Sequence, residues 1–174
     1  MEKKINRRNF ISTSALAGAG LSLPISASGE APSFLQRKDD RKVNIGVIGL
    51  GERGTGLMGL LLDRKDCNVV ALCDIYAPSL IRAKDRVVKA GQKIPKTFGD
   101  GEEAYLKMLE MPEIDAVLIA TPWTWHVPMA VAAMRAGKFA ATEVCGATDI
   151  QECWDLVNAY EETGVPCMFL ENVC

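Results

Sequence analysis

Three glycines and one carboxylate have the types and spacing that predict the most chemistry. Gly49, Gly51 and Gly54 follow an apolar run at residues 43–48, and Asp74 closes the next apolar run, 20 residues after Gly54. In this arrangement the first glycine permits a tight turn, the second lets backbone approach a pyrophosphate, and the third allows a helix to pack closely on a strand. The amides at the helix N-terminus then face the anion. The pattern therefore predicts a dinucleotide-binding loop.

Asp74 indicates which dinucleotide fits. An acid at this spacing accepts hydrogen bonds from the 2′-hydroxyl of the adenosine ribose, and it would repel a 2′-phosphate. We therefore expect NAD rather than NADP as the cofactor. A Rossmann-like core without a nucleotide is the alternative, but the preceding strand, the following helix and the acid together favour cofactor binding.

Apolar runs alternate with segments of helical period along residues 42–174. We expect strands near residues 43–48, 68–74, 96–98, 115–121, 139–143 and 166–172. We expect helices near residues 54–63, 77–90, 101–110, 126–136 and 149–163. This alternation is typical of an α/β fold of the Rossmann type, in which a doubly wound, mostly parallel sheet is covered on both faces.

Cofactor and substrate meet at the carboxyl ends of the strands in such a sheet. The residues there that stand out are Trp123, Trp125 and His126 after residues 115–121, Glu143 at the end of residues 139–143, and Asn172 in the last strand. The two tryptophans suit an apolar wall for a cofactor ring. Asn172 suits a hydrogen bond to the cofactor.

His126 and Glu143 are the candidate catalytic residues. His126 is the only histidine, and we expect it near the nicotinamide or the substrate; the alternative is a hydrogen-bonding residue at the start of a helix. Glu143 ends an apolar strand, where an unpaired buried carboxylate is costly. We expect it to act as an acceptor or base facing ribose or sugar hydroxyls, and the alternative is a cap for the helix that follows Gly146.

Charge and cysteine usage exclude several classes of function. The chain carries 20 basic and 22 acidic residues, so it lacks the basic footprint expected for nucleic acid or an anionic membrane. The six cysteines show no CxxC and no metal-ligand spacing, so we expect no metal site and mostly small buried thiols. Their disulfide pairing stays open, as does assembly into a homo-oligomer.

The amino terminus is typical of an export signal. Lys3, Lys4, Arg7 and Arg8 precede a mildly apolar, small-residue stretch. We expect residues 1–29 to be a twin-arginine-type signal peptide, residues 30–41 a polar linker, and the mature protein periplasmic or secreted without a membrane anchor. A basic, disordered amino terminus on a cytoplasmic protein is the alternative.

The last expected strand, residues 166–172, lies almost at the end of the sequence, which is Cys174. A dinucleotide-binding half needs further walls to select a substrate. We therefore expect residues 42–174 to form the NAD-binding domain and a C-terminal α/β substrate domain to be missing.

Several stretches together resemble the amino-terminal half of the Gfo/Idh/MocA oxidoreductases, over about residues 42–174. They are GLGERG, the strand that ends in Cys-Asp, IDAVLIATPWTWH, AVAAMRAGKF and the strand that ends at Glu143. Dehydrogenases of this family follow that glutamate with Lys-Pro, and the lysine handles the hydroxyl proton. Val144 and Cys145 stand there instead, which weakens the prediction of an ordinary sugar dehydrogenase.

The stretches WTWH, EVCGA, ECWD and LENVC are similar to glycoside hydrolase family 109. This resemblance implies NAD contacts from Glu52, Arg53, Asp74, Trp123, Thr124, Trp125, His126, Glu143, Val144 and Asn172. Cys145 replaces the more usual serine, and Val127 stands where a second histidine is common.

The resemblance also implies a reaction, with a sugar or glycoside as substrate. C3 of the sugar is transiently oxidised, the C1 group is eliminated, water adds, and C3 is reduced again, so that net hydrolysis consumes no cofactor. An α-N-acetylgalactosaminidase-like enzyme is thus the leading hypothesis. An NAD-dependent sugar or polyol dehydrogenase and an inactive nucleotide-binding module are the alternatives.

Overall fold

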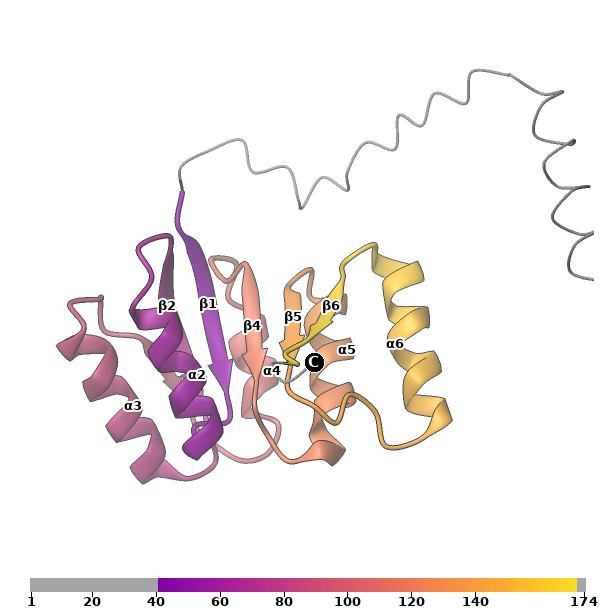
Figure 1. Ribbon diagram of the computed structural model, residues 1–174, viewed down its shortest axis with the longest axis horizontal. Helices are drawn as coiled ribbons and strands as arrows, with labels where there is room; N and C mark the ends of the chain where they lie inside the picture. The colour runs from indigo at the N-terminus through magenta and orange to yellow at the C-terminus, as the bar shows by residue number, and fades with distance from the viewer. Residues whose placement is uncertain (1–40, 172–174) are drawn as a thin grey trace, which may run out of the picture. The chain divides into compact units, whose positions relative to one another are not determined.

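The computed structural model describes residues 41–171 (Figure 1). Residues 1–40 lie outside the described residues, and they hold the predicted signal peptide and all of the predicted linker except Arg41. Asn172 also lies outside them. Their predicted roles, and the predicted periplasmic or secreted location, stay predictions.

The described residues form one parallel sheet of six strands in the order β3-β2-β1-β4-β5-β6. The strands are β1 (Val43–Ile48), β2 (Cys67–Cys73), β3 (Lys96–Phe98), β4 (Ala116–Ile119), β5 (Phe139–Thr142) and β6 (Cys167–Phe169). The strand order reverses its direction between β1 and β4, and this is the point where doubly wound sheets bind ligands. The predicted α/β Rossmann-type fold is confirmed.

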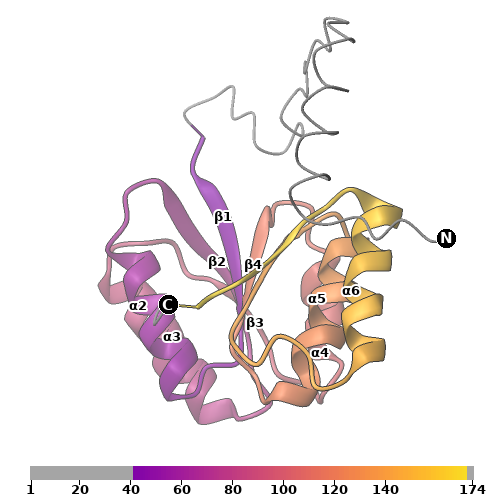
Figure 2. The ribbon, with the colours of Figure 1, turned by 45° about the vertical axis from the view of Figure 1, so that its right-hand side comes forward.

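Five α-helices within residues 41–171 cover the two faces of the sheet. They are α2 (Glu52–Leu62), α3 (Ala77–Lys89), α4 (Ala104–Leu109), α5 (His126–Arg135) and α6 (Ile150–Thr163). Helices α2 and α3 pack on one face, while α4, α5 and α6 lie on the other (Figure 2). This division follows from right-handed crossovers between parallel strands, which change face where the strand order reverses.

Each central strand buries both of its faces. In β1, Val47 belongs to the apolar cluster beneath α2 and α3, and its neighbour Ile48 belongs to the cluster beneath α4 and α5. In β4, Leu118 and Ile119 divide in the same way. Because successive side chains point to opposite faces, these strands need continuous apolar runs rather than alternating ones. That is why their positions were predictable.

Several element boundaries differ from expectation. Strand β6 covers only Cys167–Phe169 of the expected residues 166–172. Helix α2 begins at Glu52, two residues before the expected start, because the helix starts directly from Gly51 as its N-cap. Strand β4 ends at Ile119 rather than residue 121, since the chain turns at Pro122 into a short 3₁₀ helix, η2 (Trp123–Trp125). Helix α4 is shorter than residues 101–110 at both ends.

The ends of α6 agree with expectation. The Asp149 side chain caps the helix by accepting the amide of Glu152 at 2.8 Å, and the Glu152 carboxylate accepts the amide of Thr148 at 2.6 Å. This reciprocal pair satisfies amides that have no partner inside the helix. Gly164 ends the helix with φ of 68°, a left-handed conformation that glycine adopts without a steric penalty.

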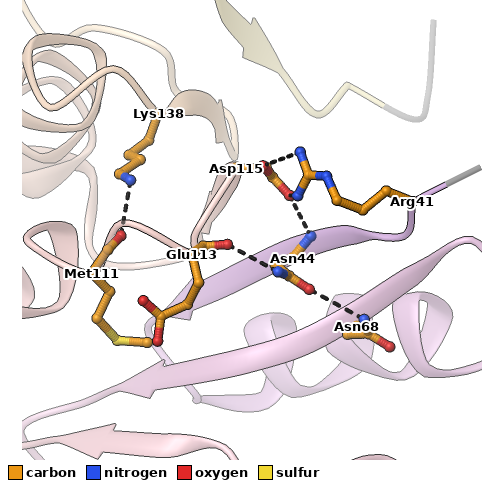
Figure 3. A network of polar contacts seen from close by, with 7 residues as sticks. All are labelled: Arg41, Asn44, Asn68, Met111, Glu113, Asp115 and Lys138. Carbon is orange, nitrogen blue, oxygen red and sulfur yellow. Dashed lines mark hydrogen bonds and ion pairs between the residues drawn. The ribbon is translucent and has the colours of Figure 1, made fainter. Parts of the chain in front are cut away.

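A polar network ties together the amino ends of three strands (Figure 3). Asp115 accepts two hydrogen bonds from Arg41, each 2.9 Å, and one from the amide of Asn44 at 2.8 Å. The Asn44 side chain donates to the carbonyl of Glu113 and accepts from Asn68. These contacts fix the register of β1 against β2 and against the segment that leads into β4.

Cysteine burial is more varied than expected. Cys67 and Cys73 are buried and Cys167 is partly buried, but Cys145 and Cys153 are exposed, which contradicts the expectation of mostly buried thiols for these two. All five are free. No helix in the described part of the chain is long and apolar enough to span a membrane.

Thiol labelling checks this packing. Burial raises the pKa of the Cys73 thiol to about 12 and that of Cys167 to about 11, so both stay protonated and unreactive at pH 7–8. In a Cys174→Ser variant, we expect a maleimide to modify Cys145 and Cys153 first and the other three only after unfolding, as read by peptide mass spectrometry. Equally rapid labelling of Cys73 in the folded protein would contradict the arrangement.

Candidate cofactor site

A cleft of about 450 Å³ lies at the carboxyl ends of the central strands. Six residues predicted from the sequence line it: Gly49, Gly51, Glu52, Arg53, Asp74 and Trp125. They come from the β1–α2 loop, the end of β2 and η2. The fold thus brings together residues that lie more than 70 positions apart in the chain.

The three glycines meet the demands predicted for them. Gly49 has φ of 85°, and a Cβ there would lie 2.5 Å from the carbonyl oxygen of Ala120. A Cβ on Gly54 would collide with the carbonyl oxygen of Gly49, so α2 packs on the strand end only with glycine at this position. A Cβ on Gly51 would meet nothing within 4 Å. Gly51 therefore presents bare backbone to open space in the cleft.

The start of α2 suits an anion. Gly51, the N-cap, makes no side-chain cap hydrogen bond, and the Thr55 hydroxyl donates to the carbonyls of Leu50 and Gly51. The Thr55 side chain thus contacts carbonyl groups and not the amides of the first helical turn, so these amides remain available to a ligand in the cleft. Such amides, at the positive end of the helix dipole, bind phosphate groups.

Asp74 is held by backbone amides beside the glycine loop. One carboxylate oxygen accepts the amide of Leu50 at 2.6 Å, and the other accepts the amide of Tyr76 at 2.8 Å. Each oxygen retains a further lone pair for a ribose hydroxyl. The cleft wall also includes Glu52 and Glu102, so a 2′-phosphate would enter a cleft that already holds three carboxylates.

The other end of the cleft is apolar. Thr121, Pro122, Trp125 and Met129 line it, and the Trp125 ring packs edge-to-face on Tyr105, with ring centroids 6.4 Å apart. This wall suits a flat aromatic ring. Trp125 thus takes the place predicted for it, whereas Trp123 is 63% exposed and Thr124 is also exposed, and neither lines the cleft.

Glu143 lies behind the cleft wall. It is 7% exposed and does not line the cleft, and its Oε1 accepts a hydrogen bond from Nη2 of Arg53 at 2.9 Å. Arg53 has a side chain 49% exposed and lines the cleft itself. The carboxylate is therefore paired, as the cost of burying it requires, and its partner comes from the glycine loop.

His126 is almost fully buried, with 1% exposure. Its Nδ1 lies 2.8 Å from the carbonyl oxygen of Cys145, and its Nε2 lies 2.8 Å from that of Thr121. The ring joins the loop after β4 to the loop after β5. These contacts match the helix-start alternative, and His126 does not line the cleft; its expected role near the nicotinamide or the substrate stays a prediction.

Val144 faces a different hollow. It lines a second groove of about 810 Å³, between the β5–α6 loop, α6 and β6, together with Cys145, Cys153 and Phe169. Val144 and Cys145 are joined by a cis peptide bond. The structure therefore separates Val144 from the cofactor cleft that the resemblance assigned to it.

Sequence reasoning missed several residues of the cleft. Ile75, Glu102 and Met129 line it. Glu102 follows β3, so the rule that ligands bind at strand carboxyl ends was sufficient to find it. Met129 lies within α5 and carries no such signal. Within residues 41–171, no three His, Cys, Asp or Glu side chains come together as a metal site.

Comparison with known proteins agrees with this geometry. A family model described as "Oxidoreductase family, NAD-binding Rossmann fold", for Gfo/Idh/MocA proteins, matches residues 43–170. The chain belongs to the Gfo/Idh/MocA oxidoreductase family. The description of the family supports a nicotinamide cofactor, and the open backbone at Gly51, which lines the cleft, fits such a group.

Two curated relatives are glycoside hydrolases by name. A "Glycosyl hydrolase family 109 protein" of Stenotrophomonas maltophilia is 44% identical over 98% of this chain. An "Alpha-N-acetylgalactosaminidase" of Tannerella forsythia is 39% identical over 97% of it. The chain spans 36% and 39% of the lengths of these two proteins.

Solved structures share the fold. The crystal structure of scyllo-inositol dehydrogenase from Lactobacillus casei with NAD(H) and scyllo-inositol superposes with a TM-score of 0.65 at 20% identity, over 75% of this chain and 36% of that one. At this identity the likeness establishes the Rossmann architecture.

Alanine substitutions at three glycines of this region distinguish effects on packing from effects on NAD binding. Gly54→Ala forces a methyl group against the Gly49 carbonyl, and we expect it to lower the free energy of unfolding by about 1–3 kcal/mol or more. Gly51→Ala meets no atom of the protein, so we expect little change in stability but roughly tenfold or greater loss of NAD affinity, because backbone no longer approaches the pyrophosphate.

Gly56→Ala is the matched control. It lies in the same helix, is exposed, and has open space around its Cβ, so we expect a gain of about 0.5–1 kcal/mol in stability and unchanged NAD affinity. Denaturant unfolding and calorimetric titration measure both quantities. An unchanged NAD affinity for Gly51→Ala would contradict the assignment of the pyrophosphate site.

Proposed function

We propose that this chain is the NAD-binding part of a glycosidase of the α-N-acetylgalactosaminidase type. The observation that carries the proposal is the pair Val144 and Cys145, which follows Glu143 where dehydrogenases of the family have Lys-Pro. Without that lysine the chain lacks the group that handles the hydroxyl proton in ordinary hydride transfer. The names of the two curated relatives support the same conclusion.

The residues of the cleft divide the work of holding the dinucleotide. Asp74 holds the adenosine ribose, the backbone at Gly51 and the start of α2 hold the pyrophosphate, and the wall at Trp125 and Met129 orients the ring. Bound NAD⁺ supplies a hydride acceptor that later returns the hydride to the same sugar carbon. Because the cofactor is regenerated in each turnover, this chemistry favours a cleft that retains it.

The acidic cleft wall supports NAD over NADP. Asp74 is held at the rim by two backbone amides, and Glu52 and Glu102 add further negative charge. A 2′-phosphate would be repelled there, whereas a 2′-hydroxyl gains an acceptor.

Asp74→Asn tests this specificity. We expect NAD affinity to fall roughly tenfold to a hundredfold, since a hydrogen bond to a charged group contributes about 1.5–3 kcal/mol. The preference for NAD over NADP is expected to shrink at the same time, because the repulsion is removed. Asp85→Asn, on the exposed side of α3, controls for loss of one charge and is expected to change neither affinity. Equal NAD and NADP affinities in the unaltered chain would contradict the proposal.

The functional test is the nucleotide that accompanies the protein. We expect purified, unsupplemented protein to release NAD(H) in stoichiometric amount when denatured, as measured by absorbance and mass spectrometry. Protein that arrives empty but binds added NAD points to a dehydrogenase that exchanges its cofactor in each turnover. Protein that neither carries nor binds NAD refutes the cofactor role itself.

A further inference from the structure

The ion pair between Arg53 and Glu143 joins the glycine loop to the end of β5. The two residues are 90 positions apart, and the two side-chain atoms lie 2.9 Å from each other. Glu143 is buried, and its amide donates to the carbonyl of Ile119 at 3.0 Å. Its backbone is therefore fixed at the end of the sheet and its side chain is buried, while the Arg53 side chain is half exposed.

Only one partner of the pair faces the cleft. Arg53 lines it and Glu143 does not. Arg53 also supplies the only basic side chain among the described residues that line this cleft, whose other charged residues are Glu52, Asp74 and Glu102. A pyrophosphate entering this acidic surrounding needs a cation, and the guanidinium stands beside Gly51 and the start of α2.

We propose that Glu143 is a positioning residue for Arg53, and that Arg53 is the side chain that binds the pyrophosphate of the dinucleotide. The guanidinium has five N–H donors in a fixed plane. One of its nitrogens is held by Glu143, which sets the orientation of the others toward the cleft. This assignment differs from the sequence expectation, in which Glu143 itself contacts the ribose or the substrate. It rests on the proposed function, because it takes the dinucleotide as the ligand.

The charges of the pair support this division of roles. The pKa of Arg53 is raised, chiefly by its side-chain hydrogen bond to Glu143; desolvation opposes this, and attraction to Glu143 and Glu171 adds to it. Arg53 is thus a permanent cation held in one place. Because the buried carboxylate already holds the Arg53 guanidinium, the arginine loses less conformational entropy on ligand binding than an unpaired arginine would lose.

Three ligands test different parts of the cleft. Adenosine occupies the end at Asp74, ADP adds the pyrophosphate, and NAD adds the nicotinamide riboside. We expect Arg53→Gln to weaken ADP and NAD by the same factor, roughly tenfold to a hundredfold, and adenosine by less than about twofold. Calorimetric titration of the whole chain measures all three.

The direction in which Glu143→Gln changes the ADP affinity decides between two roles for Glu143. Removing a negative charge near a phosphate site strengthens ADP binding if only long-range electrostatics matters. If Glu143 positions Arg53, the variant weakens ADP and NAD alike, by roughly threefold to tenfold, and adds nothing in the Arg53→Gln background. Arg64→Gln, which breaks the exposed pair with Asp66, is the matched control and is expected to change no affinity.

Other outcomes overturn the proposal. Loss of NAD affinity with unchanged ADP affinity in Glu143→Gln means that Glu143 contacts the riboside directly. Tighter ADP binding means that it only repels. Retained adenosine binding in each variant shows that the fold is intact, and unaltered protein that binds none of the three ligands refutes the proposed function instead.

Discussion

The close approach of α2 to the end of β1 is the contact on which the rest of the site depends. It requires Gly54 against the Gly49 carbonyl, where no side chain fits. Because the helix begins so near the sheet edge, its first amides face the space above the switch point between β1 and β4. The same approach brings Arg53 within reach of Glu143. Binding surface and ion pair are thus two results of one steric constraint.

Buried polar groups in this protein are matched with partners from other elements. Glu143 is paired by α2, His126 is bonded by two loops, and the buried Lys138 donates to the carbonyl of Met111 at 2.9 Å. No buried side-chain nitrogen or oxygen in the described part of the chain lacks a partner. Since leaving such a group unpaired costs about 1–3 kcal/mol, the contacts of Glu143 and His126 help to specify how the loops at the carboxyl ends of β4 and β5 are arranged.

Much of the fold followed from the sequence, because local patterns determine it. Apolar runs flanked by turn residues gave the strands, and Asp149 with Gly164 delimited α6. The glycine loop and Asp74 were also predictable, since their roles depend on backbone geometry within a short stretch. The positions of Glu143 and His126 were not, because each depends on a partner distant in the chain. Placing a residue at a strand end does not reveal that Arg53 covers Glu143, or that backbone carbonyls occupy both nitrogens of His126.

The polar network of Asp115, Asn44 and Asn68 (Figure 3) lies at the amino ends of the strands, whereas the cleft lies at their carboxyl ends. Six residues of β1 separate them, which corresponds to about 20 Å of extended chain. The contacts that hold the strands together and the residues that line the cleft therefore lie at opposite ends of the sheet. A substitution in the network at the amino ends would change how firmly the strands are held together while leaving the residues that line the cleft in place.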